Sequence, residues 1–402
     1  MKKLLVVLLV LGLAVPAMAA DWNFYGSART HLGYYSVDED FARGPATDAT
    51  IRSNGLDDDA GTTLNIYGQS RFGAKVMASD NLTGFIEFGL RETNNAAGNG
   101  VDTEEVYLRM FGGIWNFGVG SLMVGKNYTP GTFLGYSGMG ADLGDNGDAN
   151  MLVSGLAYIS RQPQIRLTFG GFDFALIQHN GSQSDTPGSS FYRNVYTLGL
   201  GDADHTIPKM EASYVFRTPV FSLRPVAGFQ TYEAENQATG QDETITSYML
   251  GLGATVNLGP AYVKATFSYL QNPGNYGQVN VLVLDAAMVG AMHAQLVDGD
   301  VEDSELMQGT FVVGAKINEM LGVEAGFGYG NVEQDVALAG GGFQEVEQTG
   351  MLYYLQVPIT VAKGMAIIPE FGFVDRDDYE IDGADIDAGD MWYADISFKV
   401  DF

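Results

Sequence analysis

Beyond residue 20, the chain alternates apolar and polar residues with a period of two, in one segment after another. In the last segment every second residue from Trp392 to Phe402 is apolar, while the residues between them, from Tyr393 to Asp401, are mostly polar. Successive side chains of a β-strand point to opposite faces of the sheet. An amphipathic helix would instead need apolar residues three and four positions apart. The pattern therefore predicts strands with one apolar face and one polar face.

Sixteen segments carry this pattern, so the sequence predicts sixteen strands. The sixth is interrupted by Gln162-Pro163, and the seventh is blurred by Phe172-Asp173-Phe174. A tilted strand needs about 9–11 residues to cross a bilayer, a length that these segments provide. The predicted strands are 22–35, 61–78, 82–92, 103–112, 119–127, 154–169, 172–179, 208–218, 222–233, 245–257, 260–270, 305–317, 321–332, 349–361, 365–376 and 390–402.

The connections between these strands alternate between short and long. Outer-membrane β-barrels have short periplasmic turns and long extracellular loops. We therefore expect an all-β fold, a transmembrane antiparallel β-barrel of sixteen strands, with both termini on the short-turn side. Short turns are expected at 79–81, 113–118, 219–221, 258–259, 318–320 and 362–364, and long loops at 36–60, 128–153, 180–207, 271–304 and 333–348.

The first twenty residues have the features of a secretory signal peptide. Two lysines follow Met1, an apolar run extends to Val15, and Ala17-Met18-Ala19 fits a cleavage site. We expect residues 1–20 to be this signal and 21–402 to be a single barrel domain. The most apolar later stretch, 279–297, contains Asp285 and His293, so we expect a loop helix or a pair of extra strands there, with a subunit contact as the alternative.

Charge and composition exclude several classes of function. The net charge is −28 at pH 7, and nucleic-acid binding needs clustered Lys and Arg, so no nucleic-acid partner is expected. The chain has no cysteine, which excludes disulfides, catalytic thiols and thiolate metal sites. Since most acids fall in the loops while the first strands are basic, we expect only a weak preference for cations.

No enzyme, cofactor or metal site is predicted. The four histidines lie in different segments without a paired spacing, so we expect solvated side chains, and no known catalytic motif occurs. Two acidic runs, at 57–59 and 298–305, carry oxygen ligands of the kind that calcium takes. We interpret both runs as solvated charge, with cation bridging to lipopolysaccharide as the alternative. The four histidines are His31, His179, His205 and His293.

Three short pieces of the sequence resemble the general porins of Gram-negative bacteria. The segment from Arg109 to Gly118 followed by 121–130 is similar to a strand, a Phe-Gly turn and the strand end that leads into the third loop of these porins. The stretch 70–75 resembles another porin segment, and Phe402 matches the terminal assembly signal of the family. Lys126 stands where the family usually has Arg, and the third loop lacks a PEFGG-like run.

The resemblance implies a homotrimer whose third loop folds into each pore, with acids on that loop facing bases on the wall. The implied loop acids are Asp142, Asp145 and Asp148, and the implied wall bases are Arg29, Arg71, Lys75, Arg91 and Arg109. Such opposed charges tune ion selectivity. Lys126 is in phase with Leu122 and Val124, so it points into the lumen only if the strand bends.

The sequence therefore predicts an outer-membrane pore for passive diffusion of small hydrophilic solutes and ions, in contact with lipid and lipopolysaccharide. The alternative is a substrate-specific channel for sugars or organic acids, with a track of aromatic side chains. A barrel that carries an enzyme or adhesin, and a soluble β-protein, are disfavoured, because no catalytic cluster or external domain is visible and one strand face is apolar. The aromatic track would be Tyr25, Tyr67, Tyr107 and Tyr136.

Overall fold

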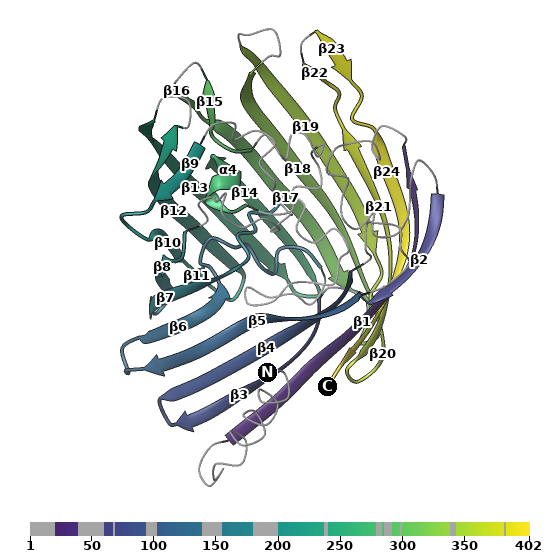
Figure 1. The fold of residues 1–402 in the computed structure, drawn as a ribbon. Helices are drawn as coiled ribbons and strands as arrows, with labels where there is room; N and C mark the ends of the chain where they lie inside the picture. Colours follow the sequence, from purple (N-terminus) through teal and green to yellow (C-terminus); the bar gives the residue numbers. More distant parts are fainter. Residues whose placement is uncertain are drawn as a thin grey trace.

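The computed structural model forms a closed antiparallel barrel of sixteen strands, in which several wall positions hold two or three consecutive elements (Figure 1). The residues that the structure describes are 21–38, 60–66, 69–93, 103–138, 155–179, 200–236, 240–278, 284, 292–297, 300–337, 343–381 and 383–402. The expected signal peptide, 1–20, lies outside them.

The wall elements follow one another around the barrel in chain order. They are β1 (Asp21–Val37), β2 (Ala60–Ile66) with β3 (Ser70–Ser79), β4 (Leu82–Thr93), β5 (Thr103–Asn116), β6 (Ser121–Tyr128), β7 (Arg161–Phe169), β8 (Phe172–Ile177), β9 (Leu200–Asp204) with β10 (Lys209–Tyr214) and β11 (Phe216–Arg217), β12 (Phe221–Asn236), β13 (Gln241–Leu258), β14 (Ala261–Gln271), β17 (Ser304–Lys316), β18 (Gly322–Ala337), β19 (Phe343–Gln356) with β20 (Ile359–Ala362), β21 (Met365–Arg376) and β24 (Asp390–Asp401).

Pairing of the first and last strands closes the barrel. One edge of β1 pairs with β24 from Ser27↔Asp401 to Val37↔Met391. The other edge pairs first with β3 and then with β2. Closure leaves no free sheet edge, which a membrane requires because lipid cannot hydrogen-bond to open backbone groups.

The two faces of the wall differ as the alternation predicts. On β1, Trp22 and Phe24 are 44% and 68% exposed on the outside, whereas the alternate residues Ser27 and Arg29 are each 3% exposed. The outer face is therefore apolar and the inner face polar. Among the described residues, no helix is both long and apolar enough to cross a membrane.

A bulge in β5 corrects two sequence expectations. The register shifts between Glu87 and Phe88 of β4, so that Glu87 pairs with Met110. Met110 then faces inward with Glu87, while Phe111 is 57% exposed outside. Strict alternation along the predicted strand 103–112 would place Met110 on the outer face, and this is wrong, because a bulge inserts an extra residue and reverses the phase beyond it. The turn expected at 113–118 is also misplaced, since β5 continues to Asn116.

Two further boundaries differ from the prediction. The sixth strand was expected at 154–169, but only Arg161–Phe169 is a strand, and residues 155–160 lie before it without regular structure. A long loop was expected at 333–348, but β18 and β19 stay paired as far as Ala337↔Phe343. The polar residues that suggested a loop therefore belong to two paired strands.

The long-loop end carries small additional elements. Helix α4 (Pro273–Tyr276) lies on the inner side of the wall, and two short hairpins, β15–β16 (Gln295–Val297 and Asp300–Glu302) and β22–β23 (Tyr379–Ile381 and Ala384–Ile386), stand above it (Figure 1). Within the described residues of the apolar stretch 279–297, only Gln295–Val297 is a strand, and its partner β16 lies after the stretch. Leu284 and Met292 of this stretch are buried.

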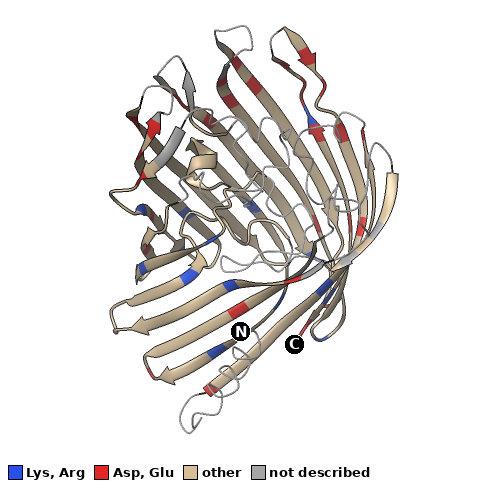
Figure 2. Ribbon diagram, in the orientation of Figure 1, with Lys and Arg blue, Asp and Glu red and all other residues tan. Residues whose placement is uncertain are grey.

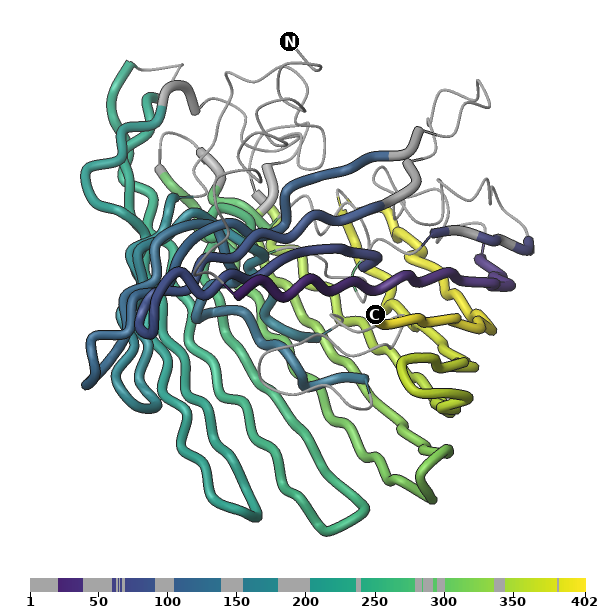
Figure 3. Tube along the Cα trace, turned by 90° about the horizontal axis from the view of Figure 1, so that it is seen from below, coloured from purple at the N-terminus to yellow at the C-terminus, as the bar shows by residue number. Residues whose placement is uncertain are grey.

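The third loop, between β6 and β7, enters the barrel. Its described parts, 129–138 and 155–160, lie inside the ring of strands (Figure 3). All residues from Thr129 to Gly138 are buried. The two parts are bonded to each other, since the Phe133 N–H donates to the Ala157 carbonyl at 2.8 Å. We call this segment loop 3, and its inward fold matches the expectation.

Candidate functional site

Five inward side chains of β1, β3, β4 and β5 form a compact group around one carboxylate. Arg109 Nε donates to Glu87 Oε1 at 2.8 Å, and Tyr25 Oη donates to Glu87 Oε2 at 3.0 Å. Arg71 Nε lies 3.9 Å from the same carboxylate, and Lys75 Nζ lies 5.8 Å from the Tyr25 ring. We call these five residues the basic wall cluster. It holds three bases and one acid, so it is positive.

The cluster continues to the rim of loop 3 through a shared tyrosine. Tyr128, the last residue of β6, accepts hydrogen bonds at its hydroxyl from Arg109 Nη2 at 3.1 Å and from Arg161 Nη1 at 3.3 Å. The Arg161 guanidinium also lies 5.1 Å from the Tyr128 ring centre. Tyr158 of loop 3 packs edge-on against Tyr128. Burial raises the pKa of Tyr158, as does Tyr128, so its hydroxyl stays neutral.

A cavity of about 580 Å³ lies against this cluster inside the barrel. Arg71 and Lys75 line it together with Lys399, whose Nζ pairs with Asp401 at 3.3 Å. Asn127 and Tyr128 bound the cavity where β6 leads into loop 3. The charged side chains that line this space are three bases, Arg71, Lys75 and Lys399, and two acids, Glu87 and Asp401.

Loop 3 rests on the opposite wall, where glycines make room for its aromatic side chains. A Cβ at Gly253 of β13 would come within 2.3 Å of the Tyr136 hydroxyl, and one at Gly251 within 2.8 Å of the Phe133 ring. The two rings contact each other edge to face at 5.4 Å. Burial raises the pKa of Tyr136 to about 12. Each of these two glycines therefore makes room for one particular ring.

Charged residues of the same wall hold the loop backbone. Arg224 of β12 donates to the carbonyls of Pro130 and Thr132 at 2.9 and 3.1 Å. The Gly138 N–H donates to Glu324 of β18 at 2.7 Å. The sequence did not predict these contacts, because a charged residue on the inner face of a strand gives the same sequence pattern whether its side chain faces water or a loop. The pore is thus bounded by loop 3 on one side and the basic wall cluster on the other.

The predicted wall bases divide into three groups. Arg71, Lys75 and Arg109 come together as described above. Arg29 is also inward, but it bonds to Ser27 and Gln69, both at 3.0 Å, and does not line the cavity. Arg91 pairs with Glu105 in the β4–β5 ladder. The predicted loop acids Asp142, Asp145 and Asp148 lie outside the described residues.

Lys126 does not join the cavity lining. It pairs with Phe111, whose side chain is on the outer face, and its Nζ donates to the Leu108 carbonyl at 3.1 Å, next to the β5 bulge. Lys126, which stands where the porin family usually has Arg, therefore binds a backbone carbonyl beside the bulge. The backbone of Phe402 is hydrogen-bonded to Gly26 in both directions, at 2.8 and 3.0 Å, while the residue as a whole is 74% exposed.

The histidines are less solvated than expected. His31 is 5% exposed, and its Nδ1 contacts Asp395 Oδ2 at 2.6 Å across the β1–β24 closure. Ser397 Oγ approaches the same Nδ1 at 3.3 Å. In a hydrolytic triad the serine and the aspartate bind different ring nitrogens, so this group has the residue types of a triad without its geometry.

Two other histidines stack on each other above the wall. The His179 and His205 rings lie 3.7 Å apart and nearly parallel, and Tyr232 packs on His205 at 4.8 Å. Burial lowers the pKa of both rings, and the neighbouring His179 lowers the pKa of His205 further. Within the described residues, no three His, Asp or Glu side chains are grouped closely enough to hold a metal ion.

Acidic residues gather at the long-loop end. Figure 2 shows them at the upper ends of β18 and β19 and on the β22–β23 hairpin. Glu333 pairs directly with Glu347, and Asp335 with Glu345, in the ladder of β18 and β19. The pore therefore has an acidic mouth above a basic interior wall.

Comparison with known proteins agrees with this architecture. The family model described as "Gram-negative porin" matches residues 5–291, well over half of the chain. The chain belongs to the Gram-negative porin family. It is an outer-membrane channel for passive diffusion. No curated protein sequence matches it.

Solved porin structures share the fold at low sequence identity. The outer-membrane channel DcaP of Acinetobacter baumannii is 15% identical with a TM-score of 0.62, covering 96% of this porin and 99% of that chain. OmpT of Vibrio cholerae is 14% identical with a TM-score of 0.54 over 96% and 99%. The anion-selective porin from Comamonas acidovorans is 13% identical with a TM-score of 0.53 over 96% and 100%. At such identities these likenesses bear on the fold alone.

Proposed function

We propose that this porin passes small hydrophilic solutes and ions without a dedicated binding step, and that its narrow part favours anions. The observation that carries this proposal is the cavity beside the basic wall cluster. Arg71, Lys75 and Lys399 line it, against Glu87 and Asp401. Glu87 is bound to Arg109 at 2.8 Å, and Asp401 to Lys399 at 3.3 Å. Both acids are therefore paired, and the remaining charge is positive.

An anion preference would reverse the weak cation preference expected from the overall charge. The narrowest stretch of a pore sets its selectivity most strongly, because rings of charge act there at close range. Exposed charges more than about 10 Å away are screened at 0.1 M salt. The acids of the mouth then attract ions from solution without deciding which of them cross. One solved porin of this fold, that of Comamonas acidovorans, is anion-selective.

Reversal potentials across planar bilayers test the proposal. With the purified porin in a KCl gradient at about 0.1 M salt, where distant charges are screened, the reversal potential should have the sign that a preference for chloride produces. The double variant Arg71→Gln/Lys75→Gln should move the potential toward potassium. Arg29→Gln is the matched control, since Arg29 bonds to Ser27 and Gln69 away from the cavity lining. A potassium preference in the unmodified porin would refute anion selectivity.

A substrate-specific channel is less well supported, because its proposed aromatic track is not continuous. Tyr25 donates to Glu87, and Tyr107 accepts from Arg109, both on the basic wall. Tyr136, a residue of loop 3, is 1% exposed and packs against the opposite wall. Tyr67 lies outside the described residues. Block of the current by a single sugar or organic acid, saturating at low concentration, would favour this second function.

We further propose a homotrimer and the absence of enzymatic activity. One solved structure of similar fold is the trimer form of Vibrio cholerae OmpT. Proteins of this family and fold are channels rather than enzymes. The misaligned His31–Asp395–Ser397 group supports the same conclusion. Mass measurement of the detergent-extracted porin should give three chains, and the purified protein should hydrolyse no ester substrate. The barrel exterior would contact lipid and lipopolysaccharide.

A further inference from the structure

A buried charged pair on β10 lies where two inward-folded loops meet. Lys209 and Glu211 are 0% and 1% exposed, and Lys209 Nζ lies 3.2 Å from Glu211 Oε1. Neither side chain lines the cavity beside the basic wall cluster. A charged pair that is this deeply buried costs desolvation energy, so it persists only where further hydrogen bonds satisfy both partners. Its other partners identify what it does.

One set of partners comes from the loop between β14 and β17, at residues 272–278, which include α4. We call these residues the loop-6 segment. Lys209 Nζ donates to the Tyr276 carbonyl at 2.7 Å and lies 3.8 Å from the centre of the Tyr276 ring. Tyr276 Oη donates to Glu211 Oε1 at 3.0 Å. Burial and the Glu211 carboxylate raise the pKa of Tyr276, so the hydroxyl remains a donor.

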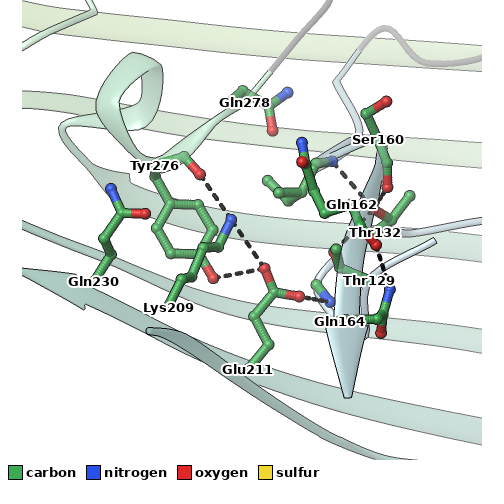
Figure 4. Close-up of polar contacts among 12 residues, drawn as sticks. Thr129, Thr132, Ser160, Gln162, Gln164, Lys209, Glu211, Gln230, Tyr276 and Gln278 are labelled. Atoms are coloured by element: carbon green, nitrogen blue, oxygen red, sulfur yellow. Dashed lines mark hydrogen bonds and ion pairs between the residues drawn. The ribbon is translucent and has the colours of Figure 1, made fainter. Parts of the chain in front are cut away.

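The other partner comes from loop 3. The Gly131 N–H donates to Glu211 Oε2, the second oxygen of the same carboxylate. A Cβ at Gly131 would come within 2.7 Å of that oxygen, so only glycine allows the approach. Figure 4 shows Lys209, Glu211 and Tyr276 pointing toward one another at this junction. One carboxylate thus binds loop 3 with one oxygen and the loop-6 segment with the other.

A second contact joins the two loops directly. Gln278, which is 1% exposed, accepts a hydrogen bond from the Tyr158 N–H at 3.0 Å and donates to the Leu156 carbonyl at 3.1 Å. Leu156 and Tyr158 belong to the returning part of loop 3, whereas Gly131 belongs to its outgoing part. The loop-6 segment therefore contacts both parts of loop 3.

The wall is shaped to receive this junction. A Cβ at Gly228 of β12 would lie only 1.7 Å from the Tyr276 hydroxyl. Asn275 is fixed beside it, since its carbonyl accepts from Gln230 at 2.9 Å and its side chain donates to Tyr232 at 2.8 Å. These contacts hold the loop-6 segment rigidly enough to support loop 3.

We propose that the loop-6 segment and loop 3 dock as one unit on the β10–β13 wall, with Glu211 and Gln278 coupling them, so that loop 6 fixes the position of loop 3 and hence the pore width. Glu211, Tyr276 and Gln278 are positioning residues that act through loop 3. The proposal rests on the channel function of the fold and is independent of the anion preference.

Cysteine labelling tests the coupling, because the chain contains no cysteine of its own. Ser137→Cys places a reporter in loop 3, where Ser137 is 3% exposed. Its rate of reaction with a water-soluble maleimide measures how often loop 3 leaves the wall. Changing loop 6 alone, by Tyr276→Phe with Gln278→Ala, should raise this rate by about tenfold, since the lost bonds leave buried partners unsatisfied.

A matched control removes a buried tyrosine–glutamate hydrogen bond between two wall strands, β24 and β21. Tyr393 Oη donates to Glu370 within the wall, so Tyr393→Phe should leave the Ser137→Cys rate unchanged. An unchanged rate in the loop-6 variants, within about twofold, would overturn the coupling. So would an equal rise in Tyr393→Phe, since it would indicate general loosening of the barrel.

Two further measurements keep the test independent of folding and transport. If the double variant does not assemble, Gln278→Glu takes its place. This variant keeps the acceptor for the Tyr158 N–H but loses the donor to the Leu156 carbonyl, so the labelling rate of Ser137→Cys should rise by less. No rise in that rate would count against coupling. Coupling is also reciprocal, so Phe133→Ala in loop 3 should raise labelling of Met292→Cys, a buried position beyond the loop-6 segment. Labelling needs no current, so these results hold whatever the ion selectivity.

Discussion

Single glycines on the inner face of the wall decide where the loops can lie. Gly228, Gly251 and Gly253 each leave space for one aromatic ring of a loop: those of Tyr276, Phe133 and Tyr136. Glycine in a strand often marks a close approach by another part of the chain. The sequence shows these glycines, but it does not say which ring approaches them, because the loops return from distant positions.

Filling one of these spaces should loosen loop 3. Gly253→Ala puts a methyl group about where the Tyr136 hydroxyl lies, and overpacking of this kind typically costs about 1–3 kcal/mol. The urea midpoint for loss of the folded gel band should fall accordingly. Gly113→Ala is the matched control, because its nearest neighbour, the Thr83 carbonyl, would be 3.6 Å away. Equal midpoints in the two variants would contradict the assignment of Gly253 to Tyr136.

The stacked histidines predict a local dependence on pH. Burial lowers the pKa of His179 and His205, so the folded state binds protons less readily than the unfolded chain. The sign follows from linkage: the contact is stable above the ordinary value of about 6.5 and weakens as pH falls through the lowered pKa. Asp204 opposes the shift at His205, and Tyr232 contributes no charge at these pH values. After division by the intrinsic exchange rate at each pH, the protection of the amides at residues 200–208 should be lower at pH 5 than at pH 7.5, with the difference reduced in His205→Asn.

At the scale of strands, a substitution of the C-terminal residue should affect assembly of the barrel without affecting its stability. Phe402 is bonded to Gly26 through its backbone, and the residue as a whole is 74% exposed. Phe402→Ala keeps both backbone bonds, so the free energy of unfolding of the refolded barrel should change by less than about 0.5 kcal/mol, as for an exposed position. The amount of barrel in the outer membrane should nevertheless fall several-fold if the exposed ring is an assembly signal. Val400→Ala, a change at an exposed position of β24, serves as the control.

Period-two alternation predicted the sixteen strands well because each strand has a polar face and an apolar face along its length. It failed where the phase or the surroundings change. Met110 was assigned to the wrong face because the bulge opposite Glu87 leaves no mark in the sequence. Residues 155–160 keep an apolar character but pack inside the barrel, so they were assigned to a strand. Lys209 and Glu211 alternate as wall residues do, and only the fold reveals that they face loops.

At the scale of the whole molecule, two regions of opposite charge lie in series along the pore. The chain carries a net charge of −28, with like-charged pairs such as Glu333↔Glu347 at the mouth. Below them, Arg71 and Lys75 line the cavity, while the nearby acid Glu87 is bound to Arg109. The selectivity of the channel therefore depends on how far each region's field extends.

Salt controls that distance, so ion preference should reverse with ionic strength. The screening length is about 30 Å at 0.01 M and about 8 Å at 0.15 M. At the lower salt the acids of the mouth act on ions throughout the pore, and potassium should be favoured. At the higher salt only groups that line the narrow part act on a crossing ion, and chloride should be favoured. Reversal potentials at a fixed KCl ratio around these two mean concentrations should differ in sign.

Neutralising the mouth by Glu333→Gln/Glu347→Gln should shift the low-salt potential toward chloride and leave the high-salt value unchanged, because the acids are then beyond the screening length. A potential of constant sign in the unmodified porin would mean that one charged region governs the pore at all salt concentrations.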